Sequence, residues 1–480
     1  MANSMTPDMN AQEFRAAAHE VVERIATFLQ EPERWRVLPT VAPGEIRAAL
    51  PASAPAQGES FDDILADFDR LIMPATTHWN HPGFMAYFAT SGSTPGILAE
   101  ALIAALNVNA MLWRTGPAET ELEEVTLGWL RQMIGLPEQF DGVINDTASS
   151  STLYALAAAR EYQSDLHLRA EGLAGRPEVP RMRVYCSEEA HSSVDKAVIT
   201  LGLGLSGVRR VPTDETLRMD VKALQNAISE DRARGIRPIA VVATVGTTST
   251  TAIDPVAGIA DICERENVWL HVDAAYGGSA AIIPEMRWVL QGCERAHSLV
   301  INPHKWMFVP MDCSVLYTAR PDLLRAAFSL VPEYLVTAEG NVARNLMDYG
   351  VSLGRRFRAL KLWFVLRYFG TQQMADRLRE HILLAEELEG WIREDADFEL
   401  LAPRTFSVVV FRFRPADASE DQLEKLNARI LDAVNASGEV FLSHTKVRGR
   451  YGLRIAIGNL RTKRSHVARA WSLITQAANL

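Results

Sequence analysis

Two stretches decide the fold: VWLHVDAAY at residues 268–276 and SLVINPHKW at residues 298–306. Each contains a short apolar run that ends in polar residues, which is typical of a buried strand. Similar runs occur at Arg183–Cys186, Ile239–Val245 and Ser314–Thr318, and helical patterns occur at Thr94–Ala110, Glu119–Ile134 and Ser150–Tyr162. Short apolar runs that alternate with helices predict βαβ units, and hence an α/β fold with a largely parallel, buried sheet. Ligands of such sheets bind at the carboxyl ends of the strands.

Both ends of the chain differ from this central pattern. A helical stripe runs from Phe14 to Leu29, prolines then extend the chain, and a second short helix is predicted at Phe61–Ile72. An amphipathic helix cannot bury its apolar face alone, so we expect it to cover the main domain or a partner subunit. The C-terminal part predicts a small α+β domain, with helices at Gln372–Glu394, after Ser419 and at the C-terminus, and strands at Thr405–Phe413 and Gly452–Ile457. The chain therefore divides into an N-terminal segment (1–87), a large α/β domain (88–370) and a small C-terminal domain (371–480).

Composition excludes several classes of protein. The 49 Lys and Arg residues against 59 Asp and Glu residues give a net charge of −10. We therefore expect no nucleic-acid partner and no attraction to anionic membranes. No stretch approaches the roughly 20 apolar residues that a membrane span needs, and no secretory signal is expected. The four cysteines form no C-x-x-C pair, which indicates reduced, buried thiols in a cytoplasmic protein.

A lysine and an aspartate follow the two decisive strands. Lys305 comes directly after the second run, where burial would lower its pKa and make the amine nucleophilic; the alternative is a solvated lysine at a strand end. Asp273 ends the first run and suits a buried cation, although it could instead cap the segment that follows. The two residues are 32 positions apart, about one βα repeat. This spacing would bring them into one crevice.

Two further stretches add an anion site and a ring. NDTASSSTLYAL at residues 145–156 places small and hydroxyl residues at the start of an apolar helix, where free N–H groups suit a phosphate. Such a cluster is also common as an ordinary helix cap. His191 lies in EEAHSSVDKA, residues 188–197, on a loop after a predicted strand. A loop histidine is most often structural or solvated, but its ring could also stack on a flat cofactor.

Together the four features match the requirements of pyridoxal 5'-phosphate. That cofactor needs an amine to condense with its aldehyde, a carboxylate for its ring nitrogen, a phosphate site and a stacking ring. A hydride-transfer dehydrogenase and an NTPase are disfavoured because the sequence has neither G-x-G-x-x-G nor G-x-x-x-x-G-K-[ST]. No metal site is predicted, because His78, His81, His271 and His304 form no H-E-x-x-H pattern.

On these residues the chain resembles the aromatic-L-amino-acid decarboxylase family, which are group II pyridoxal-phosphate decarboxylases, over nearly its whole length. NPHKW at 302–306 is similar to the family's cofactor-lysine signature, and HVDAAY at 271–276 to its aspartate segment. ATVGTT at 243–248, HWNHPGFMAYFAT at 78–90 and LGRRF at 353–357 resemble its cofactor-contacting strand end, its substrate pocket and a late active-site segment.

The resemblance implies a type I, aspartate-aminotransferase-like fold. It also implies a homodimer with active sites at the subunit interface and an N-terminal segment that wraps the partner. Lys305 would carry the cofactor, Asp273 would hold the ring nitrogen and His191 would stack on the ring. The remaining cofactor contacts would come from Thr147, Ala148, Ser149, Thr248, Ala275, Asn302 and His304. The substrate pocket would include Trp79, Tyr87, Phe88, Thr90, Met111, His191 and Gly354.

The activity implied is decarboxylation of tryptophan, tyrosine, DOPA or phenylalanine to the arylalkylamine and CO2. Tyr334, in VPEYL at 331–335, occupies the family's proton-donor position on its catalytic loop. The alternative is an aldehyde synthase on the same scaffold; such relatives have phenylalanine in place of Tyr334, or asparagine in place of His191. A non-catalytic relative would be expected to lose Lys305.

Some positions depart from the family pattern and leave the exact substrate open. The phosphate loop reads TASSS at 147–151 where animal members usually have SASEA, Asn80 replaces a common histidine, and Met111 replaces a common aromatic residue. Gly354 suits a large indole or catechol ring, because a serine there would press on a bicyclic substrate. Gly354 could alternatively serve only a turn before the next helix.

Overall fold

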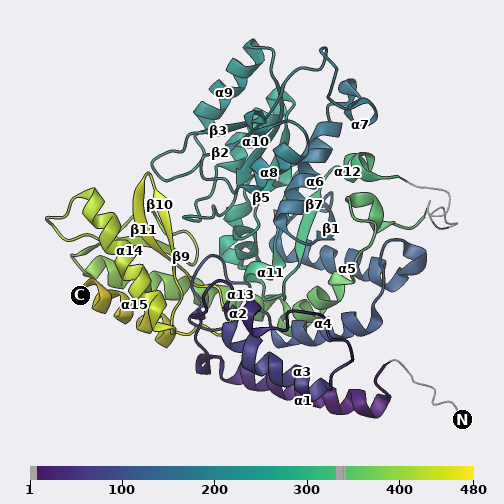
Figure 1. Cartoon of the computed structure of the whole chain (residues 1–480). Helices are drawn as coiled ribbons and strands as arrows, with labels where there is room; N and C mark the ends of the chain where they lie inside the picture. The colour runs from purple at the N-terminus through teal and green to yellow at the C-terminus, as the bar shows by residue number, and fades with distance from the viewer. Residues whose placement is uncertain (1–7, 331–338, 340–341, 480) are drawn as a thin grey trace, which may run out of the picture.

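A seven-stranded sheet forms the centre of the molecule (Figure 1). The computed structural model describes residues 8–330, 339 and 342–479. The strands of this sheet are β1 (Asp141–Asn145), β2 (Met182–Ser187), β3 (Val208–Val211), β4 (Arg237–Thr244), β5 (Trp269–Asp273), β6 (Ser298–Ile301) and β7 (Ser314–Thr318). Their spatial order is β1-β7-β6-β5-β4-β2-β3. All pairs from β6 through β3 are parallel, whereas β7 runs antiparallel to both β6 and β1. The prediction of a mostly parallel central sheet is confirmed.

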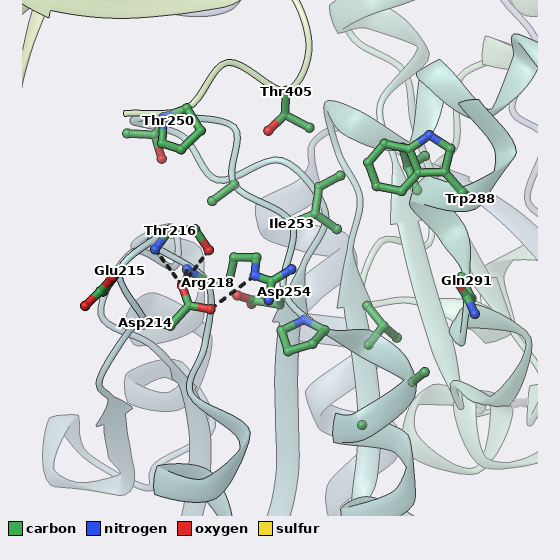
Figure 2. Close-up of a pocket in the computed structure, with 17 residues that line it drawn as sticks. Asp214, Glu215, Thr216, Arg218, Thr250, Ile253, Asp254, Trp288, Gln291 and Thr405 are labelled. Carbon is green, nitrogen blue, oxygen red and sulfur yellow. Dashed lines mark hydrogen bonds and ion pairs between the residues drawn. The ribbon is translucent and has the colours of Figure 1, made fainter. Parts of the chain in front are cut away.

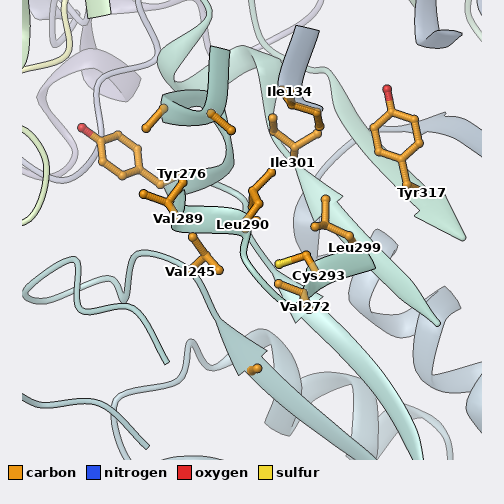
Figure 3. Packing of buried hydrophobic residues seen from close by; sticks show 14 of the residues in the cluster. Ile134, Val245, Val272, Tyr276, Val289, Leu290, Cys293, Leu299, Ile301 and Tyr317 are labelled. Carbon is orange, nitrogen blue, oxygen red and sulfur yellow. The ribbon is translucent and has the colours of Figure 1, made fainter. Parts of the chain in front are cut away.

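The inner strands are buried on both faces, which explains why they read as continuous apolar runs. Every residue of β5 and β6 is buried, and Val272 is the register partner of Leu299. Figure 3 shows these two side chains beside Cys293 and Leu290, which come from the short 3-10 segments between β5 and β6. Together they form part of a core that extends to the helices on one face of the sheet.

Helices cover the sheet on both sides and begin and end at recognisable signals. They are α4 (Thr94–Leu106), α5 (Pro117–Ile134), α6 (Ala148–Glu161), α7 (Leu168–Glu171), α8 (Ser193–Thr200), α9 (Val221–Ala233), α10 (Val256–Glu266), α11 (Pro303–Trp306) and α12 (Pro321–Phe328). Proline occupies the first turn of α4 and α5, where its missing N–H costs nothing. Gly135 ends α5 in the left-handed conformation that favours glycine.

The C-terminal part forms a second, antiparallel sheet in the order β10-β11-β9-β8. Its elements are α13 (Arg358–Glu394), β8 (Phe398–Leu400), β9 (Val408–Phe413), α14 (Glu420–Ser437), β10 (Ser443–Val447), β11 (Arg450–Ala456) and α15 (Arg464–Ala478). A kink at Gly370, which has positive φ, divides α13 near the predicted helix break. The capping box of Ser419 and Gln422 is present at the start of α14. The small α+β unit is therefore confirmed.

The N-terminal segment contains α1 (Ala11–Gln30), α2 (Glu45–Ala49) and α3 (Phe61–Asp67). The stretch after α1 was expected to be extended, but α2 forms within it, between two of the prolines. Farther along, the Met85 N–H donates to Phe441 O (3.0 Å) and Met85 O accepts from Ala456 N–H (2.9 Å). The chain just before residue 87 is thus held by the C-terminal sheet. The three-part division of the chain at 87 and 370 stays a prediction.

Membrane insertion finds no support in the helices. Within residues 8–330, 339 and 342–479, none combines the length and the apolar character that crossing a bilayer requires.

Candidate active site

The sheet places Asp273 and Lys305 at neighbouring strand ends. Asp273 is the last residue of β5 and pairs in register with Val300 of β6. Lys305 follows in α11, where its N–H donates to Asn302 O (2.9 Å) and so closes a tight turn after β6. One Asp273 oxygen accepts the Ala275 N–H at 3.1 Å, so this carboxylate does cap the next turn, as the alternative proposed. Its other oxygen remains available to a ligand.

The two charges act on each other and on His191. Burial lowers the pKa of Lys305, the Asp273 carboxylate opposes this, and the charge of Arg454 lowers the pKa further. Burial also lowers the pKa of His191, against the opposing effect of Asp273. The structure therefore brings the predicted amine, carboxylate and ring into one electrostatic environment, in which the neutral amine is favoured.

A stack of aromatic rings lies beside Lys305. Phe88 stacks on Tyr276 with ring centroids 3.9 Å apart, and Tyr276 stacks on Trp306 at 4.7 Å. The Trp306 Nε1–H donates to His381 Nδ1 at 3.0 Å, which fixes the indole. Lys305 Nζ lies 5.1 Å from the centre of the Phe88 ring. The Lys305 amine therefore lies over a rigid stack of aromatic rings.

Arg454, on β11, is a site residue that the sequence analysis missed. Its guanidinium carbon lies 4.8 Å from the centre of the Phe88 ring. It donates to the backbone oxygens of Tyr87 and Ser249, and one guanidinium nitrogen is buried with no partner in the described chain. Burial lowers its pKa to about 10. A buried cation at this place joins the C-terminal sheet to the Lys305 centre.

The backbone of Tyr87 is strained, a feature of the site that the sequence does not show. Tyr87 has φ of +50°, which is unusual for a bulky residue. Its carbonyl accepts from Arg454, and its N–H donates to Ser443 Oγ at 3.3 Å. Contacts with two strands of the C-terminal sheet thus hold the conformation.

The start of α6 forms an uncapped helix end, as a phosphate site requires. Thr147 is the N-cap residue, but its side chain makes no capping hydrogen bond, which disfavours the ordinary-cap alternative. The N–H groups of Ala148 and Ser149 belong to the first turn, where a helix offers no internal acceptor. Ser151 Oγ bonds to Asn145 Nδ2 (3.1 Å) and to Ser314 Oγ (3.0 Å), fastening this helix end to β1 and β7.

The remaining predicted cofactor residues line the same strand ends. Thr248 lies in an exposed position after β4, just beyond Val245, whose N–H donates to Asp273 O (2.8 Å). Ala275 is buried, and its carbonyl accepts the Asn302 N–H at 3.1 Å. The Cys313 N–H donates to His304 Nδ1 (2.9 Å), and burial lowers the pKa of His304 to about 3. His304 is therefore neutral, with its proton on Nε2.

His191 uses one ring nitrogen locally and leaves the other free for a ligand. The Ser193 N–H donates to its Nδ1 at 3.1 Å, so the neutral ring carries its proton on Nε2. The residue as a whole keeps solvent-accessible surface, although neighbouring atoms partly cover its ring.

Several of the predicted substrate residues belong to one loop. Trp79 lies against Tyr87 with centroids 6.0 Å apart. Asn80, at a position where animal family members commonly have histidine, accepts the Gly92 N–H at 2.8 Å and closes the loop that carries Tyr87, Phe88 and Thr90. Asn80, which departs from the family pattern, thus stabilises this loop.

Gly354 and Met111 occupy a different place, next to each other. The Arg355 N–H donates to Asn109 Oδ1 (2.9 Å), and Arg355 O accepts the Ala110 N–H (2.9 Å). An added Cβ at Gly354 would have only Asn109 Nδ2 nearby, at 3.9 Å, and the backbone there does not adopt positive φ. The alternative that glycine is needed for a turn is therefore not supported. Tyr334 lies outside the residues that the structure describes.

A separate cavity of about 750 Å³ contains none of these residues. Figure 2 shows Asp214 hydrogen-bonded to Thr216 and Arg218 at one end of it and Trp288 at the other. Its inner wall includes Asp254, whose carboxylate accepts the Thr244 N–H at 2.8 Å; burial raises the pKa of Asp254 to about 6. This cavity reaches the site only indirectly, through the end of β4.

The residues present fit pyridoxal phosphate. An amine with a lowered pKa faces a carboxylate, and an uncapped helix end lies at the edge of the same sheet. Asn302, at the end of β6, is 2 % exposed, and its side-chain oxygen has no hydrogen-bond partner in the part of the chain that is described. Buried polar atoms are normally paired, so a polar ligand is expected here.

The fold and site define a pyridoxal-phosphate enzyme, and comparisons with known proteins give the family. Residues 43–414 match the pyridoxal-dependent decarboxylase conserved domain. Tryptophan decarboxylase 2 of Oryza sativa is 39% identical, over 98% of this chain and 95% of its own. Phenylacetaldehyde synthase of Arabidopsis thaliana is also 39% identical, over 98% and 97%. The crystal structure of Oryza sativa TDC with PLP and tryptamine matches with a TM-score of 0.94 and 36% identity, over 98% of both chains.

The chain therefore belongs to the pyridoxal-dependent decarboxylase family. It is a decarboxylase that uses pyridoxal phosphate, and its fold is the one that the sequence predicted.

Replacing Arg454 by glutamine is expected to slow cofactor uptake at neutral pH. Only a neutral amine attacks an aldehyde, and the Arg454 charge helps to lower the pKa of Lys305. Without that charge the pKa rises, and a rise of one pH unit lowers the neutral fraction about tenfold. The pH profile of pyridoxal phosphate uptake by the apoprotein, followed by absorbance, should move to higher pH.

Arg454→Lys is the matched control, because it keeps the charge. Its pH profile should stay near that of the wild type. If both variants moved equally, the lost hydrogen bonds to Tyr87 and Ser249 would be responsible, and the electrostatic explanation would be wrong.

Proposed function

We propose that this enzyme decarboxylates aromatic L-amino acids to arylalkylamines. The observation that carries the proposal is the aromatic surface beside the amine: Lys305 Nζ lies 5.1 Å from the centre of the Phe88 ring, which stacks on Tyr276. A flat aromatic side chain gains about 0.5–1.5 kcal/mol from each well-placed ring beyond the burial of area. Relatives named as tryptophan and tyrosine decarboxylases support the same substrate class.

Each residue of the site has a proposed task in that reaction. Bound pyridoxal phosphate supplies an electron-withdrawing ring that accepts the electrons of the Cα–carboxylate bond as CO2 leaves. Lys305 holds the cofactor through its amine, and Asp273 keeps the ring nitrogen protonated. His191 covers the ring face, while Thr147, Ala148 and Ser149 hold the phosphate. Thr248, Ala275, Asn302 and His304 complete the cofactor shell.

The pocket is proposed to need a second copy of the chain. The segments that carry Gly354 and Met111 are hydrogen-bonded to each other, whereas Phe88 adjoins Lys305. A homodimer with the site at its interface would bring the two groups together. The N-terminal helices support this, because α1 has no buried residue and its Phe14 is 62% exposed. Figure 1 shows α1, α3 and α4 on one side of the molecule. These helices and the turns that follow α3 carry exposed apolar residues: Phe14, Val22, Ile25, Ile64, Phe68, Ile72, Leu98, Leu102 and Leu106.

A cytoplasmic location is part of the proposal. All four cysteines are buried and unpaired, as expected for a protein kept in a reducing compartment.

The second candidate is an aldehyde synthase, and Tyr334 decides between the two. A relative of 39% identity is named phenylacetaldehyde synthase, so the scaffold is compatible with either product. We propose that Tyr334 delivers a proton to the substrate Cα after CO2 leaves. Its presence, together with His191, favours the amine.

Tyr334→Phe should therefore convert much of the amine product to aldehyde, ammonia and peroxide. Without the phenol proton the substrate Cα stays unprotonated for longer, and oxygen can react there. Purified wild type and variant, each loaded with cofactor, are compared on a panel of amino acids with amine, aldehyde and CO2 all measured. Aldehyde from the wild type would favour the second candidate, and an unchanged amine yield in the variant would remove Tyr334 from the mechanism.

Gly354→Ser should lower kcat/KM for tryptophan more than for tyrosine. One misplaced heavy atom in a hydrophobic pocket costs about 1–3 kcal/mol, or roughly tenfold and more in kcat/KM. The structure leaves room for the serine within its own chain, so the effect should not come from misfolding. A wild-type preference for histidine or an acidic amino acid, or equal losses on both substrates, would contradict this pocket.

Complementation tests whether Gly354 serves the partner's site. Lys305→Ala and Gly354→Trp homodimers should each be inactive towards tryptophan. Mixed dimers would contain one site with both native residues, so random co-assembly should restore about a quarter of the wild-type activity. If Gly354 served the Lys305 of its own chain, no mixed dimer would contain an intact site and no activity would return.

A further inference from the structure

The edge strand that leads into the phosphate site is held by a buried ion pair. β1 is the outermost strand beside β7, so the outward backbone groups of its residues have no neighbouring strand. At Ile144 the N–H donates to Glu123 Oε1 (2.8 Å), and the carbonyl accepts from Arg355 Nη2 (2.6 Å). Glu123 and Arg355 are themselves paired at 3.1 Å, with side chains 4% and 8% exposed. The pair thus replaces a missing strand at one residue.

Arg355 is also fixed through its backbone. Its N–H donates to Asn109 Oδ1 and its carbonyl accepts the Ala110 N–H, both at 2.9 Å. Its neighbours in these two segments are Gly354 and Met111, the predicted substrate residues. One residue therefore joins the end of β1 to the segments proposed to reach the partner's substrate.

The end of β1 determines where the cofactor phosphate would lie. Ile144 is three residues before Thr147, and Asn145 Nδ2 donates to Ser151 Oγ in the first turn of α6 (3.1 Å). A cavity of about 120 Å³ separates Ile144, Asn145 and Asp146 from Gly354 and Arg355. The Arg355 side chain crosses this cavity and bonds directly to the Ile144 carbonyl.

We propose that Arg355, paired with Glu123, is a positioning residue for the phosphate site of Thr147, Ala148 and Ser149. The inference rests on the proposed placement of the cofactor phosphate at that helix end. One guanidinium nitrogen, Nη2, bonds to the Glu123 carboxylate and to the Ile144 carbonyl at once, and the ammonium of a lysine, whose side chain is one bond shorter, would not reach both. Displacing the end of β1 would turn the first N–H groups of α6 away from the phosphate.

The test compares Arg355→Lys with Arg356→Lys. Arg356 is the next residue and lines the same cavity, but its side chain is half-exposed and pairs with Glu100 at 2.7 Å instead of Glu123. Dissociation constants of the apoprotein are measured for pyridoxal phosphate and for pyridoxal, which lacks the phosphate. Arg355→Lys should weaken binding of pyridoxal phosphate at least tenfold and leave pyridoxal within twofold. Arg356→Lys should leave both within twofold.

The 31P NMR line of bound pyridoxal phosphate gives a second readout. It should shift in Arg355→Lys and stay unchanged in Arg356→Lys, with both apoproteins melting near the wild-type temperature. Equal weakening for both ligands, or an unshifted line in Arg355→Lys, would show that the ion pair serves stability alone and would overturn the proposal.

A second variant keeps the proposal testable if Arg355→Lys does not fold. Glu123→Gln retains an acceptor for the Ile144 N–H but removes the charge that orients Arg355, and it should show the same phosphate-specific loss to a smaller extent. If the wild type itself bound pyridoxal as tightly as pyridoxal phosphate, the placement of the phosphate would be wrong. That outcome is distinct from failure of the Arg355 inference.

Discussion

The attraction between Asp273 and Lys305 at the ends of β5 and β6 is the interaction on which the site depends. Both groups lie at the ends of buried strands, where the loss of water disfavours a charge, and the Asp273 carboxylate offsets part of this effect on the Lys305 amine. Asp273 raises the pKa of Lys305 while burial and Arg454 lower it. These opposing effects on the pKa of Lys305 favour a reactive amine and leave the carboxylate with a partner. They arise because the parallel strands β5 and β6 are neighbours in the sheet.

The rest of the centre is built by residues that are far apart in the sequence. Phe88 comes from the segment that the C-terminal sheet holds, Tyr276 follows β5, and Arg454 lies on β11. Because Arg454 donates to the Tyr87 carbonyl, the C-terminal sheet controls the backbone of a substrate residue. The C-terminal sheet thus contributes a side chain to the surroundings of Lys305 and Phe88. The same principle operates at β1, where Glu123 and Arg355 hold an edge strand that leads into the phosphate site.

The sequence pattern did not predict the strands at the edges of the two sheets. The strands predicted from the sequence were β2, β4, β5, β6 and β7 of the central sheet and β9 and β11 of the second. The four strands that were not predicted, β1, β3, β8 and β10, are the outermost strands of the two sheets. Three of these edge strands, β3, β8 and β10, are partly exposed and carry no continuous apolar run, and β1 is mostly buried but reads DGVIN, with only two large apolar residues.

The sequence by itself determined the class of fold and the cofactor chemistry, and it predicted the proposed site residues at the strand ends, including Lys305, Asp273, Thr147 and His191. Local pattern suffices there, because a buried parallel strand must be apolar and its catalytic residues must follow directly after it. Only the tertiary structure revealed Arg454, the positive φ of Tyr87 and the contact of the Gly354 segment with Asn109. These features arise from contacts between segments hundreds of residues apart, and no local pattern of residues records which distant backbone a side chain will meet.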